Sequence, residues 1–206
     1  MRDTVDRQRR AFWLKYLHQW HWISSAVCLI ALVLFAGTGF TLNHAGSIEA
    51  APKVEHRKAT LPADVLATLA ASGKSAPLPA PVRDWIDTRM HLSLAAKDAD
   101  WSDDEVYLAL PRPGGDAWLS IQRDSGEVEY EVTDRGWISY LNDLHKGRNT
   151  GAVWSWFIDI FALACLIFAI TGLFLLKMHA AQRGATWPMV ALGLVLPLVL
   201  VLLFIH

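Results

Sequence analysis

Three long apolar runs divide the chain, and polar or charged residues border each of them. They cover Trp22–Leu42, Val153–Leu176 and Pro188–Phe204. A helix needs about 20 predominantly apolar residues to cross a bilayer, so each run predicts a transmembrane helix. Pro188 is tolerated because it stands at the start of its helix. Pro197 lies inside the third run and predicts a kink.

The segment between the first two runs has a different pattern. Apolar and polar residues alternate in Ala117–Arg123 and again in Glu127–Val132, on either side of the turn sequence Asp124–Gly126. Alternation with period two around a short turn predicts an antiparallel hairpin. Four other pieces are expected here: a strand over Val106–Leu110, a short amphipathic helix over Leu61–Ser72, a proline-rich loop over Ala76–Val82 and a helix over Trp137–Leu144. Together they predict a small α+β domain inserted between two membrane helices.

A helix break is expected between this domain and the second membrane helix. His145 and His179 are 34 residues apart, and one continuous helix of that length would span roughly 51 Å. A bilayer with its headgroups is only roughly 40–45 Å thick. The glycine-bounded stretch Gly147–Gly151 is the expected site of the break.

Charge distribution sets the expected topology. The net charge of −1 gives no reason to expect a nucleic-acid partner. Residues 1–20 hold five Lys or Arg against two Asp, whereas residues 43–152 hold seventeen Asp or Glu against twelve Lys or Arg. Basic residues near the first span favour a cytoplasmic N-terminus, which puts residues 43–152 on the far side of the membrane. The 21-residue first run is longer than a typical signal-peptide core, so it is read as an uncleaved anchor.

Four histidines flank the first two apolar runs. His21 and His44 stand near the two ends of the first run, and His145 and His179 bracket the second. Imidazole is a common metal and haem-iron ligand, and a polar side chain at the edge of lipid is often functional. The pairs His21/His179 and His44/His145 therefore predict two ligand pairs, one near each face of the membrane.

The first of these histidines has a competitor. His18 and His21 are three residues apart and share one helix face. On an ideal helix His18 lies nearer to the direction of His44, so the choice between the two depends on further evidence. His206 is interpreted as a solvated chain end, and His56 and His91 as surface residues.

The sequence contains no motif for nucleotide binding or for cysteine chemistry. The chain has no glycine-rich nucleotide fingerprint and no phosphate-binding loop. Cys28 and Cys165 fall inside apolar runs and are interpreted as small buried hydrophobes. The dipeptides Thr38-Gly39 and Thr171-Gly172 recur near span ends, where small residues allow close helix packing or leave room for a flat group.

Several segments resemble one known family. Trp20-His21-Trp22-Ile23, followed seventeen residues after His21 by Thr38-Gly39-Phe40-Thr41-Leu42-Asn43-His44, resembles the first helix of PepSY-associated transmembrane proteins. This offset favours His21 over His18. Ser120–Val132, with its turn Asp124–Glu127, resembles the PepSY module, and Leu144-His145-Lys146-Gly147-Arg148 resembles the segment that re-enters the membrane.

The resemblance implies a function as well as a fold. Some family members are single-subunit ferric-siderophore reductases that hold b-type haems between helices through histidines. By this resemblance the chain is expected to be a bacterial inner-membrane protein with three transmembrane helices and an inserted periplasmic PepSY-like α+β domain. Two haem b groups are expected, on His21, His179, His44 and His145. The expected division is residues 1–44, 45–144 and 145–206.

The expected partners follow from that assignment. A ferric siderophore or other ferric chelate would accept electrons, and a cytoplasmic protein, a quinol or a reduced flavin would supply them. Larger family members have four or more spans, so a homodimer would complete the haem pocket in a three-span chain, with membrane lipids around it. The alternative is a non-enzymatic sensor or inhibitor in which the PepSY-like domain binds a periplasmic protein.

Overall fold

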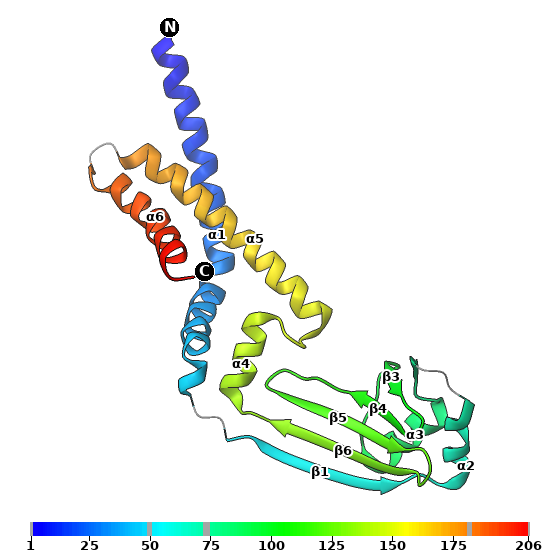
Figure 1. Ribbon diagram of the computed structural model, residues 1–206. Coiled ribbons are helices and arrows are strands. Elements are labelled where there is room, and N and C mark those ends of the chain that lie inside the picture. The colour runs from blue at the N-terminus through cyan, green and yellow to red at the C-terminus, as the bar shows by residue number, and fades with distance from the viewer. Residues whose placement is uncertain (1, 49–50, 72–74, 181–182, 206) are drawn as a thin grey trace. The chain divides into compact units, whose positions relative to one another are not determined.

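The computed structural model describes residues 2–48, 51–71, 75–180 and 183–205 (Figure 1). The chain forms two compact units. One contains residues 1–34 together with 156–206, and the other contains residues 35–155. The first unit is helical, whereas the second holds a β-sheet with short helices.

Three long helices carry the apolar runs. They are α1 (Arg2–Asn43), α5 (Gly151–His179) and α6 (Thr186–Phe204). Each is long and apolar enough to cross a membrane, which confirms the three predicted spans. At 1.5 Å per residue the 42 residues of α1 extend about 63 Å, so this helix is longer than a bilayer is thick.

The inserted domain is built on one antiparallel sheet. Its six strands follow the order β1-β6-β5-β4-β3-β2. Their bounds are β1 Lys53–Thr60, β2 Ser75–Pro77, β3 Asp98–Trp101, β4 Glu105–Ala109, β5 Gly115–Gln122 and β6 Glu127–Asp134. The predicted hairpin is β5–β6, in which Ile121 pairs with Val128 across a turn containing Gly126 at a φ of 72°. Left-handed backbone of this kind favours glycine.

One face of the sheet forms the core of the domain. The short helices α2 (Ala63–Leu66) and α3 (Ala80–Met90) lie against it, with a 3₁₀ turn over Ala67–Ala71. Leu119, Ile121 and Val128 from the strands are fully buried, as are Val82 and Ile86 from α3. Their burial on one face explains the alternation that identified these strands in the sequence.

Several elements differ from the sequence-based expectation. The proline-rich stretch Ala76–Val82 was expected to be loop, but Ser75–Pro77 forms β2 and α3 begins at Ala80. Proline is tolerated at a helix start, because its missing N–H would lack an intrahelical partner there. The sequence also gave no sign of β1, an edge strand whose residues are almost all exposed and therefore lack hydrophobic alternation.

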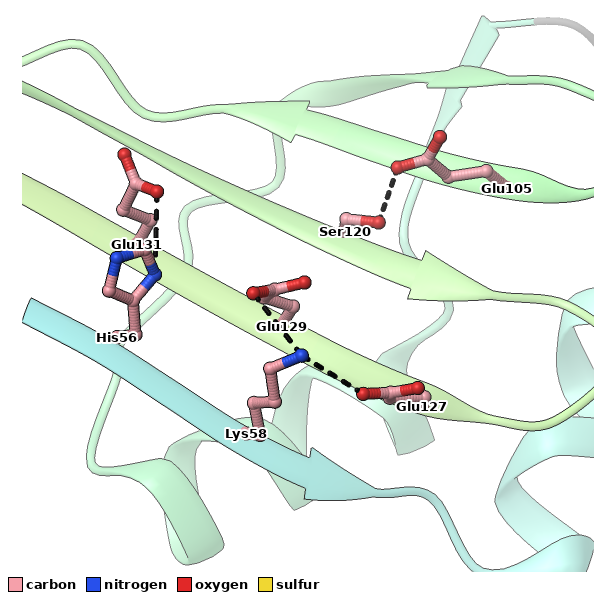
Figure 2. A network of polar contacts seen from close by, with 7 residues as sticks. All are labelled: His56, Lys58, Glu105, Ser120, Glu127, Glu129 and Glu131. Atoms are coloured by element: carbon pink, nitrogen blue, oxygen red, sulfur yellow. Dashed lines mark hydrogen bonds and ion pairs between the residues drawn. The ribbon is translucent and has the colours of Figure 1, made fainter.

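The other face of the sheet carries charged side chains. Figure 2 shows Glu127, Glu129 and Glu131 of β6 on this open face beside Lys58 and His56 of β1. Lys58 lies 3.3 Å from Glu127 and 3.4 Å from Glu129. Its hydrogen bond to Glu127 and the nearby charge of Glu129 raise the pKa of its ammonium group. Ser120 also donates a hydrogen bond to Glu105 on this face.

The last helix of this unit, α4 (Trp137–Lys146), is fixed to the hairpin β4–β5. The buried carboxylate of Asp143 accepts a hydrogen bond from the Gly114 N–H at 2.9 Å, and a Cβ at Gly114 would collide with Tyr140. The helix ends at Gly147, whose φ of 66° is left-handed. The predicted break is therefore present, and His145 belongs to α4 rather than to α5.

Candidate functional site

His21 is held by the other long helix of the first unit. Its Nδ1 lies 3.1 Å from the hydroxyl of Thr171 and 3.1 Å from the carbonyl of Phe168. Its ring stacks on the Phe168 ring at a centroid distance of 4.6 Å. A Cβ built on Gly172 would lie 3.2 Å from His21 Cε1, so the glycine makes room for the imidazole. The second Thr-Gly dipeptide therefore contacts the first predicted histidine.

His145 is held in the same way within the second unit. Its Nδ1 lies 2.7 Å from the hydroxyl of Thr38, and its ring lies 5.0 Å from that of Phe35. A Cβ on Gly39 would lie 3.5 Å from His145 Cε1. Each half-buried histidine thus rests on a Thr-Gly dipeptide far from it in the sequence.

These hydrogen bonds favour one position for the proton on each imidazole ring. The Thr171 hydroxyl donates to the carbonyls of Ile167 and Phe168, and the Thr38 hydroxyl donates to that of Phe35. With the hydroxyl proton on a helix carbonyl, the threonine oxygen is left to accept, which favours Nδ1 of His21 and His145 as the donor. At His21 the Phe168 carbonyl, which only accepts, favours the same tautomer. A neutral ring protonated at Nδ1 keeps the lone pair of Nε2 for an electrophile.

His21 and His179 line one groove in the first unit. The cavity has a volume of about 640 Å³, and apart from the two histidines its walls are apolar: Phe168, Ala169, Gly172, Leu173, Leu175 and Leu176. The Nδ1 of His179 bonds the Leu175 carbonyl at 2.9 Å, one turn back on its own helix. Its Nε2 also keeps the lone pair, because a carbonyl only accepts hydrogen bonds. The sequence-predicted pair is therefore brought to a common cavity.

His18 also reaches α5. Its ring stands edge-on to that of His179, with centroids 5.8 Å apart, and its Nδ1 bonds the Leu14 carbonyl at 2.8 Å. Unlike His21, it is exposed and contacts neither Thr171 nor Gly172 in the described residues. The arrangement favours His21 as the held imidazole and puts His18 next to its prospective partner.

No hydrogen bond or ring contact joins His44 to His145 among the described residues. The exposed His44 bonds the Phe40 carbonyl at 3.0 Å and packs its ring on Phe40 at 4.5 Å. His145 makes its contacts to Thr38, Gly39 and Phe35 instead. Both histidines nevertheless belong to the same compact unit.

The other candidate ligands and the two cysteines do not extend this site. The described residues contain no group of three or more His, Cys, Asp or Glu side chains able to hold a metal ion by themselves. His206 lies outside the described residues. Cys28 is buried, as expected for a small hydrophobe, and both cysteines are free thiols.

Comparison with known families agrees with this architecture. A family model described as PepSY_TM-like matches residues 12–206, which is nearly the whole chain. The chain belongs to the PepSY_TM-like family. The match includes all three long helices and the inserted sheet, so the domain is a PepSY-like module carried by membrane helices. No curated protein and no solved structure matches the chain.

Two residues in contact with these histidines are not assigned from the sequence. In the sequence, Thr38 and Thr171 are recognisable only as parts of a repeated dipeptide of small residues. Their contacts to His145 and His21 span 107 and 150 residues. The repeat itself was the available signal, because the same dipeptide occurs on both α1, which carries His21, and α5, which carries His179. Two such repeats suggest that both have the same role.

Proposed function

We propose that this protein is a b-type haem protein that passes electrons across the bacterial inner membrane to a periplasmic ferric chelate. The observation that carries the proposal is the groove shared by His21 and His179. Two imidazoles from two helices line one apolar cavity, and each has Nδ1 occupied and Nε2 available. Haem iron takes axial imidazole through such a nitrogen, and the porphyrin supplies the other ligands. The lack of a larger ligand cluster is therefore compatible with haem.

The residues around the histidines suit a flat apolar group. Gly172 presents no side chain to the groove, and the other walls are leucine, alanine and phenylalanine. His21 and His179 would hold the haem, which would supply one-electron Fe(III)/Fe(II) chemistry when bound. The chain's role is to hold the imidazoles in place and to exclude water from them.

The second proposed pair is His44 and His145. His145 has the same tautomer and the same Thr-Gly support as His21, which makes it a sound ligand candidate. His44 is exposed near the end of α1, where its Nδ1 is bonded and its Nε2 is available. Two haem b groups on four histidines would form the transmembrane path. One electron leaves a cytoplasmic protein, quinol or flavin donor, and one reduces Fe(III) of the chelate to Fe(II).

A homodimer is proposed as the working assembly. Few residues of the three long helices are buried: in their most apolar 18-residue stretches the buried share is 11% in the first, 6% in the second and none in the third. Lipid covers such surfaces in a membrane, and a second copy would add a wall to the haem pockets.

The second candidate is a binding module without redox chemistry. The open face of the sheet supports it, because Glu105, Glu127, Glu129 and Glu131 lie there beside stacked Tyr107 and Trp118, whose ring centroids are 6.2 Å apart. An acidic face with aromatic side chains suits a basic periplasmic protein. In that case the chain would act as a sensor or inhibitor.

An absorption spectrum of the purified full-length protein decides between the two. Haem ligation predicts sharp α and β bands of a low-spin b-type haem on reduction, and close to two haems per chain by pyridine haemochrome. His21→Ala should remove one haem, whereas His56→Ala, a change on the open sheet face, should remove none. A colourless protein from a haem-replete host, or equal haem content in both variants, would reject the haem proposal.

A further inference from the structure

We infer that Thr38 and Thr171 are positioning residues that fix the tautomer of the two half-buried histidines. The inference rests on the proposed haem function, which it deepens. It starts from the repeated geometry in which a threonine on one helix meets a histidine on another. Each threonine is followed by a glycine that faces Cε1 of the same imidazole.

The threonines have this role because of where their hydroxyl groups donate their protons. A threonine hydroxyl in a helix donates its proton to a carbonyl three or four residues earlier, which Thr38 and Thr171 both do. The oxygen then has only lone pairs left to offer. With the hydroxyl proton on that carbonyl, the facing imidazole nitrogen donates, which leaves Nδ1 protonated and Nε2 free for iron.

Such outer hydrogen bonds also change the ligand electronically. Donation from Nδ1–H to an oxygen makes the imidazole a stronger donor at Nε2 and fixes the plane of the ring. A stronger donor stabilises Fe(III) relative to Fe(II) and lowers the reduction potential. The two threonines would therefore set both the occupancy and the potential of the two haems.

The two positions are not equivalent. His21 has a second acceptor, because the Phe168 carbonyl also lies 3.1 Å from its Nδ1. Among the described contacts, Thr38 provides the sole acceptor for Nδ1 of His145. Loss of the hydroxyl should consequently have a larger effect at position 38 than at position 171.

The test compares Thr38→Val, Thr38→Ser and Thr171→Val in the full chain in lipid nanodiscs. Thr41→Val is the matched control, because Thr41 lies one turn further on α1 and bonds Asn142 rather than a histidine. The first readout uses haem-free protein: ¹⁵N NMR of the histidine rings should give the Nδ1–H tautomer for His145 in the wild type and in Thr38→Ser. In Thr38→Val that signal should be lost.

The second readout uses the haem-loaded protein. Thr38→Val should lower haem affinity at one site by roughly 10- to 100-fold, the usual cost of losing an outer hydrogen-bond partner. The haem retained should have a raised midpoint potential, and Thr38→Ser should restore both properties. Thr171→Val should have a smaller effect.

The inference is wrong if His145 keeps its Nδ1–H tautomer in Thr38→Val, or if the haem affinity and potential of that variant equal those of Thr41→Val. A wild type that carries no haem but has the expected tautomers would instead overturn the proposed function, and with it the haem role of the threonines. The NMR and haem measurements thus separate the two failures.

Discussion

The imidazole of His21 and the backbone of Gly172 approach so closely that a methyl group at residue 172 would lie 3.2 Å from His21 Cε1. The equivalent distance from Gly39 to His145 Cε1 is 3.5 Å, which is ordinary van der Waals contact. The two glycines therefore have the same place in the repeated arrangement, but a methyl side chain would fit more easily at Gly39 than at Gly172.

This difference gives a paired prediction. Gly172→Ala should displace the His21 ring by a few tenths of an ångström and lower haem occupancy at the His21/His179 groove, whereas Gly39→Ala should leave the haem at His145 in place. Haem content and the reduced spectrum of each variant provide the measurement. Gly193→Ala in α6 is the control, because nothing lies within 4 Å of its added Cβ. Equal loss in Gly172→Ala and Gly193→Ala would contradict the prediction.

His18 and His21 should differ in their effect on haem. His21→Ala removes an imidazole held by Thr171 and Phe168, so one haem should be lost. His18→Ala removes an exposed ring that only lies edge-on to His179, so the haem should remain with at most a shifted spectrum. Pyridine haemochrome analysis with protein yield measured in parallel would test this. If haem is lost in His18→Ala but kept in His21→Ala, His18 and not His21 is the haem ligand.

Lys58 should make the stability of the inserted domain depend on pH in the alkaline range. Its folded pKa is raised, chiefly by the hydrogen bond to Glu127 and then by the charge of Glu129. The stabilisation is therefore fully present below the unfolded lysine pKa of about 10.4 and is lost as pH rises through the higher folded pKa. An NMR titration of the Lys58 ammonium would measure the shift.

Glu127→Ala should lower the Lys58 pKa more than Glu129→Ala does, because it removes the hydrogen bond that is the largest cause of the raised pKa. Since the pair is at the surface, salt should weaken both effects. A Lys58 pKa that is the same in the wild type and in Glu127→Ala would refute this account.

The topology can be tested with reporters. A phosphatase fused after Asp100 should be active, and a cytoplasmic fluorescent protein fused at the same place should be dark. The reason is the excess of basic residues in the first 20 positions, which should keep the N-terminus in the cytoplasm. A fluorescent fusion with an inactive phosphatase would reverse the direction proposed for electron flow.

Local patterns in the sequence were sufficient for much of the fold. The three spans and the hairpin around Gly126 follow from hydrophobic period and turn residues, and the structure has them. β1 was missed because an exposed edge strand has no buried side to produce alternation. The start of α3 was missed because several prolines in a short stretch usually indicate loop, although the first turn of a helix accepts them.

The candidate site was less predictable than the fold. Histidines at span ends could be found by position, and His21 and His179 line a common groove in the structure. The partners Thr38 and Thr171 could not be assigned, because contacts over more than 100 residues depend on how the helices pack. A single sequence gives no measure of that packing.

The break between α4 and α5 changes how the spacing of the histidines should be read. His145 is attached through α4 and Asp143 to the hairpin β4–β5, while His179 is carried by α5, with Gly147 and Gly151 between the two helices. An insertion or deletion in that connection would change the interval between the histidines without moving His145 from Thr38. Relatives should therefore be aligned on His21 with Thr171-Gly172 and on His145 with Thr38-Gly39. The 34-residue interval between His145 and His179 can differ between relatives without disturbing either arrangement.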